Sequence, residues 1–142
     1  MNHPCPAVMN KLINLMNKKK VVTAAVVFED KIISLSFNDV KESGNPTNHA
    51  EIIAIEKASK ILGTHKLYGC WLYSTFEPCP MCSSAAVWAR MEGIVCGANM
   101  EDKSEVYTQR IAIRCREIIE NGDFNLKMFP DFMRRECLEA MG

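Results

Sequence analysis

The sequence has no run of about 18 consecutive apolar residues, the length that a membrane-spanning helix needs. It has no net charge either, because 17 basic residues are balanced by 17 acidic ones. Without a net charge there is no long-range field to attract nucleic acid or an anionic membrane. No internal repeat or low-complexity segment is visible. We therefore expect a protein without membrane spans and without a general affinity for polyanions.

The seven cysteines lack the pattern of a disulfide framework, because their number is odd and their spacing uneven. The first six residues, Met-Asn-His-Pro-Cys-Pro, also lack the charged and then apolar regions of a secretory signal. We expect a reduced, cytoplasmic protein. In such a protein Cys70, Cys96, Cys115 and Cys137 are small core or surface residues, since a free cysteine packs like a hydrophobic side chain.

Charge is unevenly distributed along the chain. The first 20 residues contain four lysines and no acidic residue, whereas residues 101 to 142 contain seven basic and nine acidic residues. So short a lysine run is typical of a solvated helix end. It is only a weak indication of phosphate contacts, since several such contacts need a clustered basic face.

The apolar pattern predicts one α/β domain over residues 1–142, a length that can bury a core without crosslinks. Apolar residues at helical spacing predict a helix over residues 8–16. Residues 21–28 and 31–37 are rich in β-branched and apolar residues and are joined by a two-residue turn, which predicts a hairpin. Residues 39–48 are predicted to form a loop, because they contain Asp, Gly, Asn, Pro and Thr.

Helices and strands alternate after this loop. A helix over residues 49–62, capped by Thr47 or Asn48, contains so many isoleucines that we expect it to be largely buried. Trp71 and Trp88 are also expected to pack in the core. The remaining elements are predicted as a strand over residues 70–74, a helix from Pro80 to about residue 90 and a strand over residues 94–98.

The last third of the chain gives weaker patterns. Residues 101–108 are polar and predict a loop or a brief helix. Ile111–Ile113 is predicted as a short edge strand, and residues 131–141 as a closing helix capped by Asp131. The whole order predicts a largely parallel sheet with helices on its faces and an antiparallel pair from the hairpin.

Two short stretches carry the candidate chemistry, His49-Ala50-Glu51 and Cys79-Pro80-Met81-Cys82. One imidazole and two thiols suit a tetrahedral Zn²⁺ with three protein ligands and a fourth position left open. Each ligand lies at the predicted start of a helix, where negative charge is stabilised. Glu51 could act as a fourth ligand, but this would close the site. We therefore predict that it transfers protons.

Simpler explanations exist for each stretch. A His-x-Glu sequence alone is usually a helix start, and Cys-x-x-Cys beside a sheet also occurs as a redox dithiol. A structural zinc site would need a fourth Cys or His at partner spacing. The combination of both stretches favours a catalytic zinc site over these alternatives. Asn38, at the end of a predicted strand, is equally suited to cap a loop or to contact a substrate.

Together these motifs resemble the zinc-dependent cytidine deaminase superfamily, whose signature is H-x-E followed by P-C-x-x-C. The resemblance extends from about residue 23 to residue 98. It includes Pro46-Thr47-Asn48-His49-Ala50-Glu51, the stretch from Ser74 to Cys82, and Gly97-Ala98. It implies a three-layer α/β/α sandwich around a five-stranded mixed sheet, in agreement with the predicted order of elements.

The resemblance also implies roles for single residues. His49, Cys79 and Cys82 would hold zinc, and Glu51 would take a proton from the attacking water and pass it to the ring nitrogen and then to the leaving ammonia. Asn38 and the backbone of Ala50 would contact the substrate.

The substrate implied is a free nucleobase or nucleoside, with a guanine-like purine favoured and a cytosine-type pyrimidine possible. Bacterial guanine deaminases and related nucleoside deaminases share Glu77-Pro78-Cys79-Pro80-Met81-Cys82 and the Val87-Trp88-Ala89-Arg90 that follows. Adenosine-to-inosine deamination in tRNA is the alternative, and a noncatalytic zinc or redox module is a remote one. The resemblance further implies a homodimer or a higher homo-oligomer.

Overall fold

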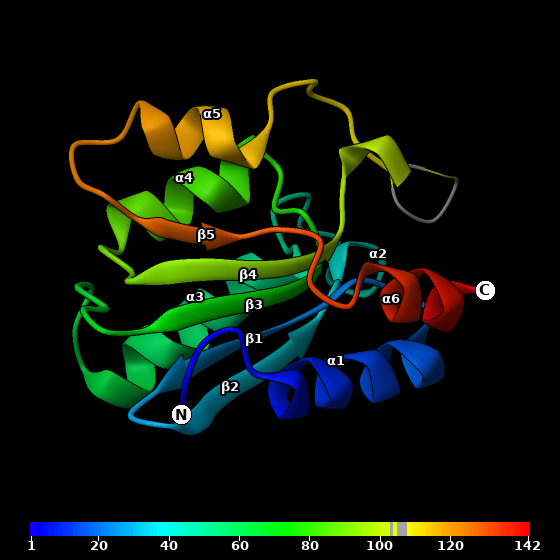
Figure 1. Ribbon diagram of the computed structural model, residues 1–142, viewed down its shortest axis with the longest axis horizontal. Helices are drawn as coiled ribbons and strands as arrows, with labels where there is room; N and C mark the ends of the chain where they lie inside the picture. Colours follow the sequence, from blue (N-terminus) through cyan, green and yellow to red (C-terminus); the bar gives the residue numbers. More distant parts are fainter. Residues whose placement is uncertain (103, 105–107) are drawn as a thin grey trace.

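The computed structural model describes residues 1–102, 104 and 108–142, and its centre is one mixed sheet (Figure 1). The five strands have the order β2-β1-β3-β4-β5. Strand β1 is antiparallel to β2 and to β3, whereas β3, β4 and β5 run parallel. The strands are β1 (Thr23–Phe28), β2 (Lys31–Phe37), β3 (Trp71–Phe76), β4 (Gly93–Ala98) and β5 (Lys127–Phe129).

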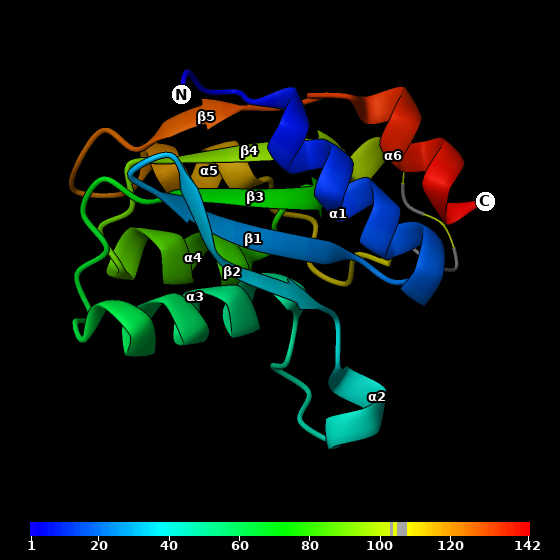
Figure 2. The same ribbon diagram turned by 90° about the horizontal axis from the view of Figure 1, so that it is seen from below.

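Helices cover both faces of this sheet, as Figures 1 and 2 show. One face carries α1 (Pro6–Lys19) and α6 (Arg134–Met141), and the other carries α3 (Ala50–Leu62), α4 (Pro80–Trp88) and α5 (Cys115–Glu120). The predicted three-layer α/β/α sandwich with a five-stranded mixed sheet is therefore confirmed. Among the described residues, no helix is both long and apolar enough to cross a membrane.

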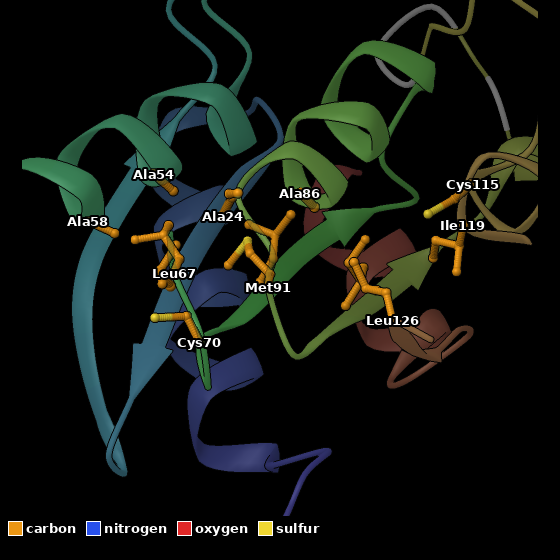
Figure 3. Close-up of a cluster of buried hydrophobic side chains, with 14 of the residues drawn as sticks. Ala24, Ala54, Ala58, Leu67, Cys70, Ala86, Met91, Cys115, Ile119 and Leu126 are labelled. Atoms are coloured by element: carbon orange, nitrogen blue, oxygen red, sulfur yellow. The ribbon is translucent and has the colours of Figure 1, made fainter. Parts of the chain in front are cut away.

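Small side chains bring the helices close to the sheet beneath the site. Figure 3 shows Ala24 of β1 facing Ala54 of α3 and Ala86 of α4 in the buried cluster on this face. On the opposite face Gly97 of β4 lies against the Cys137 side chain of α6, so any Cβ at Gly97 would collide with that sulfur. Small residues at these positions let the helices pack close to the sheet, and the starts of α3 and α4 meet at one of its edges.

The predicted hairpin is confirmed, since β1 and β2 pair around Glu29 and Asp30. Both turn residues have positive φ, 49° and 64°, which matches the twist of a two-residue hairpin turn. The predicted loop over residues 39–48, however, contains a short helix, α2 (Val40–Ser43). The expected cap of α3 is also corrected: His49 occupies the N-cap position in place of Thr47 or Asn48.

Three expectations for the last third are wrong or incomplete. Ile111–Ile113 forms no strand. The edge strand is instead β5, a three-residue segment that becomes a strand because it pairs with β4. Asp131 does not cap the closing helix, which begins at Arg134; its carboxylate accepts a hydrogen bond from Asn99 Nδ2 at 2.6 Å. Helix α5 was not predicted.

The polar stretch 101–108 begins with a 3-10 helix, η1 (Met100–Asp102), in agreement with the expected brief helix. The remainder of that expectation falls on residues 103 and 105–107, which lie outside the described residues.

Two predictions of burial also fail. Helix α3 buries only one face, made of Ala50, Glu51, Ala54 and Ala58, and Ile61 is 62% exposed. Trp88, expected in the core, is 83% exposed at the end of α4, whereas Trp71 is half-buried against His3 and Phe129. Apolar composition predicted burial for Ile61 and Trp88, but the described part of the chain leaves both side chains largely exposed.

Candidate metal centre and active site

The candidate metal ligands come from the starts of two neighbouring helices. His49 and Cys79 occupy the N-cap positions of α3 and α4, and Cys82 lies in the first turn of α4. Pro80 is the first residue of α4, where a missing N–H costs nothing. Because β3 ends at Phe76, the chain passes directly from the carboxyl end of this strand into the Cys-x-x-Cys turn.

The distances between the ligand atoms fit a zinc ion. His49 Nδ1 lies 3.6 Å from the Sγ atoms of both Cys79 and Cys82. In a tetrahedron with Zn–S of about 2.3 Å and Zn–N of about 2.0 Å, the N···S edge is about 3.5 Å, close to these distances. All three ligand atoms lie within 4.8 Å of one another. The structure thus brings the three predicted ligands together in a geometry that zinc can occupy.

The two thiols share one proton in the metal-free site. A hydrogen bond from the Cys82 thiol, together with His49, lowers the pKa of Cys79 to about 4. Donating this hydrogen bond, and burial, raise the pKa of Cys82 well above its usual range. The hydrogen bond to Cys79 also raises the pKa of His49. One thiolate is therefore present before the metal binds, and binding through both sulfurs releases a proton.

Glu51 lies in the first turn of α3 and is 4% exposed. Burial, and then the charge on Cys79, raise its pKa to about 7, while its own backbone N–H, the charge on His49 and the Ser74 hydroxyl oppose the increase. Ser74 Oγ accepts a hydrogen bond from the Phe76 N–H at 3.3 Å, which leaves the hydroxyl hydrogen for Glu51. A carboxyl with a pKa near neutrality can both accept and release a proton.

The two predicted substrate contacts lie at the same edge of the sheet. Asn38 Oδ1 accepts a hydrogen bond from the Val40 N–H at 3.1 Å and so supports the start of α2. Within the described part of the chain, its Nδ2 has no recorded partner and can donate to a ligand. Ala50 is the first residue of α3, a position whose N–H has no acceptor inside the helix.

Three polar residues around the centre were not assigned a role from the sequence. Ser74 contacts Glu51, and Glu77 forms a buried ion pair with Arg114. Ser74 interrupts an apolar strand and Glu77 lies two residues before Cys79, so the local sequence could have indicated a role at the site for both. Arg114 had none, because it lies 37 residues beyond Glu77.

These features define a class of protein: an α/β/α sandwich with a three-residue metal centre and a buried carboxylate beside it. The chain belongs to the cytidine and deoxycytidylate deaminase family, since the model of that family's zinc-binding region matches residues 3–98. Zinc is accordingly the metal that the centre binds.

Curated relatives include deaminases of two kinds. The guanine deaminase of Bacillus subtilis is 44% identical over 82 residues, which are 58% of this chain and 53% of that protein. The tRNA-specific adenosine deaminase of Aquifex aeolicus is 48% identical over 77 residues, 54% of this chain and 51% of that protein. Its counterpart from Buchnera aphidicola is 32% identical over 126 residues, 88% of this chain and 80% of that protein. The chain thus spans about half the length of the first two.

Solved structures show the same division. A tRNA:A34 deaminase studied for A-to-I editing at the wobble position superposes with a TM-score of 0.75 at 25% identity, covering 92% of this chain and 93% of that one. The guanine deaminase of Bacillus subtilis superposes with a TM-score of 0.64 at 28% identity, covering 89% and 100%. Both substrate types are therefore represented among proteins of this fold.

Proposed function

We propose that this protein is a zinc-dependent hydrolase that deaminates a free nucleobase or nucleoside, with a guanine-like purine favoured and a cytosine-type pyrimidine second. The observation that carries the proposal is the buried carboxyl of Glu51 beside the His49, Cys79 and Cys82 group. The similarity to a guanine deaminase supports it.

In this proposal His49, Cys79 and Cys82 hold zinc, which lowers the pKa of water and makes it a nucleophile at neutral pH. Glu51 accepts one proton from the attacking water and gives it to the ring nitrogen, as the water oxygen bonds to the amino-bearing ring carbon. Glu51 then moves the second proton of the former water to the amine. The C–N bond breaks, ammonia leaves, and a carbonyl replaces the amine. Ser74 holds the carboxylate of Glu51 during both transfers. Asn38 Nδ2 and the Ala50 N–H donate hydrogen bonds to the ring.

The arginines of α6 favour a small substrate over tRNA. Arg134 is committed to Asp102, which accepts from its Nε at 2.7 Å, and Arg135 lies between Glu136 and Glu139. Positive charge that is neutralised within the chain is less available to phosphates, and binding RNA needs several such contacts. Deamination of adenosine in tRNA remains the second candidate because two of the relatives described above carry out that reaction.

Ammonia release would decide between these substrates. The panel consists of guanine, adenine, cytosine, their nucleosides and a tRNA anticodon stem-loop, each with the zinc-loaded protein. We expect turnover of a free base or nucleoside. Turnover of the stem-loop alone would contradict the proposal. A redox module would turn over none of them, would lack stoichiometric zinc and would form a reversible disulfide between Cys79 and Cys82.

We also propose that the protein is a homodimer or a higher homo-oligomer. The supporting observation is the exposed apolar surface formed by Trp88 and Ile113 beside a groove of about 430 Å³ between α4 and α5. Larger exposed apolar patches mark contacts with another molecule, and we infer that this surface is part of one. In sedimentation the wild type should be a dimer or a higher oligomer and Trp88→Glu a monomer. Tyr68→Glu, a change at another exposed aromatic residue, is the control. A monomeric wild type would contradict this part of the proposal.

Two broader expectations stay proposals. The chain forms a single deaminase domain over residues 1–142, and it acts in the cytoplasm. Support for the second comes from seven free cysteine thiols, five of them buried.

A further inference from the structure

Glu77 is a buried carboxylate that the proposed reaction does not use. It follows β3 directly and precedes the ligand Cys79 by two residues. Its side chain is 2% exposed, so a charge there needs partners within the protein.

The partners of Glu77 come from two distant segments. Arg114 donates from Nε to Oε2 at 3.0 Å and from Nη2 to Oε1 at 2.9 Å. The Cys115 N–H donates to Oε2 at 3.0 Å, and the Met100 N–H approaches Oε1 at 3.5 Å. Such two-pronged charged pairs fix orientation as well as distance. The carboxylate therefore connects the turn before α4 to the start of α5 and to η1.

The backbone of the same turn is held from two other sides. The Glu77 N–H donates to the Ala98 carbonyl at 2.7 Å, and Ser83 Oγ donates to the Pro78 carbonyl at 3.0 Å. With the side chain of Glu77 also fixed, little freedom remains between β3 and the first ligand of α4. Because Cys79 ends this turn, the fixed backbone also sets the direction of its side chain.

A second arginine–carboxylate pair connects the segments that follow the two helices. Arg90 follows α4 and donates from Nη2 to Asp123 Oδ2 at 2.9 Å, and Asp123 follows α5. This pair is exposed, with 39% and 67% of the two side chains accessible. The interactions of the Arg90 side chain are with Asp123 and the Phe124 ring, neither of which belongs to the turn that carries the ligands. Both arginines connect the region of α4 to the region of α5, but only Arg114 binds Glu77. Substitution of Arg90 therefore tests the effect of packing between these regions separately from an effect on the metal site.

We propose that Glu77 is a positioning residue for the metal centre. Through Arg114 and the Cys115 N–H, its carboxylate fixes the turn of residues 77–79 and so holds Cys79 Sγ in place for zinc. Hydrogen-bonded groups behind metal ligands typically change affinity by about 10- to 100-fold when removed. The inference rests on the zinc site of the proposed function and not on the choice of substrate.

The test measures zinc affinity by competition with a chromophoric chelator, and ligand geometry by the visible absorption of the Co²⁺-loaded protein. The variants are Glu77→Gln, Arg114→Met and Arg114→Lys, with Arg90→Met as the matched control. We expect zinc affinity to fall about 10-fold or more in the first two, with an altered cobalt spectrum. Arg114→Met should be the most affected, because it leaves a buried carboxylate unpaired. Arg90→Met should bind both metals as wild type does.

Wild-type zinc affinity and cobalt spectra in Glu77→Gln and Arg114→Met would overturn the inference, whatever their thermal stability. Should either variant fail to fold, Arg114→Lys decides, since it keeps the charge and loses the two-pronged geometry. A folded Arg114→Lys with unchanged metal affinity and spectrum overturns the inference, and a loss of a few-fold supports it. Ammonia release by the wild type tests the proposed function separately, so the two can fail independently.

Discussion

Replacing Glu51 by glutamine removes its acid–base function and keeps its shape. Glu51 does not belong to the group of ligand atoms, so the variant should still bind one zinc per chain. Loss of a general acid–base residue costs about 10²- to 10⁴-fold in rate. We expect the upper half of this range, because the other buried glutamate, Glu77, is occupied by Arg114 and the Cys115 N–H and cannot substitute.

The same substitution should stabilise the metal-free protein at high pH. The pKa of Glu51 is raised from 4.5 to about 7, so the folded state binds this proton more tightly than the unfolded state does. Ionisation of Glu51 therefore lowers the free energy of unfolding as pH rises above about 4.5, and the loss is complete above about pH 7. At about 1.4 kcal/mol per pKa unit, the full loss is about 3 kcal/mol. Glutamine, which is neutral at every pH, avoids it.

Urea unfolding of the metal-free proteins at pH 4.5 and pH 8 measures the difference in stability between wild type and Glu51→Gln. Metal analysis measures the zinc content, and ammonia release measures the turnover. Glu56→Gln on the exposed face of α3 is the control, since Glu56 forms only a surface ion pair with Lys60. A variant less stable than wild type at pH 8 would refute the argument from burial. If zinc content fell together with turnover, Glu51 would be a ligand.

Three further predictions concern single residues. Cys79→Ser should lose zinc and unfold at a lower temperature, because metal binding is coupled to folding; full zinc content would remove the site assignment. Asn38→Ala should raise KM about 10-fold with zinc unchanged, since it removes one donor to the ring; steady-state kinetics with an unchanged KM would exclude the contact. Hydrogen bonds from Arg134 lower the pKa of Asp102 below its ordinary 3.8, so this carboxylate stabilises the fold above that pH and loses its effect as pH falls. Asp102→Asn should therefore cost about 1 kcal/mol in urea unfolding at pH 7 and progressively less below pH 4, and an equal cost at both would contradict it.

The sheet, its flanking helices and the meeting of the ligands could be predicted because each rests on a local pattern. The hairpin is encoded by two apolar strands with two residues between them. His49 and Cys79 stand next to helix starts that their own neighbours define. Parallel strands end at a shared edge of the sheet and the helices after them begin there, so local order was enough to place these residues together.

The failed predictions depend on partners that no local pattern identifies. Lys127–Phe129 has little strand character, and it becomes β5 by pairing with the buried edge of β4, while the more β-like Ile111–Ile113 finds no partner strand. Asp131 could cap a helix, but Asn99 of a different segment takes its carboxylate. Trp88 is a large apolar residue and yet lies on the surface. Hydrophobicity alone does not determine whether a side chain is buried within its own chain.

The same division between local and distant partners applies to the metal centre. The family match ends at residue 98, the last residue of β4, and it contains every proposed ligand. The chain beyond it reaches the centre through Glu77, which accepts hydrogen bonds from residues 23, 37 and 38 positions further along. The chain after residue 98 can therefore change in sequence away from the residues that bind Glu77 while the ligands stay in place. Guanine deaminases and tRNA adenosine deaminases both occur among the relatives of this chain.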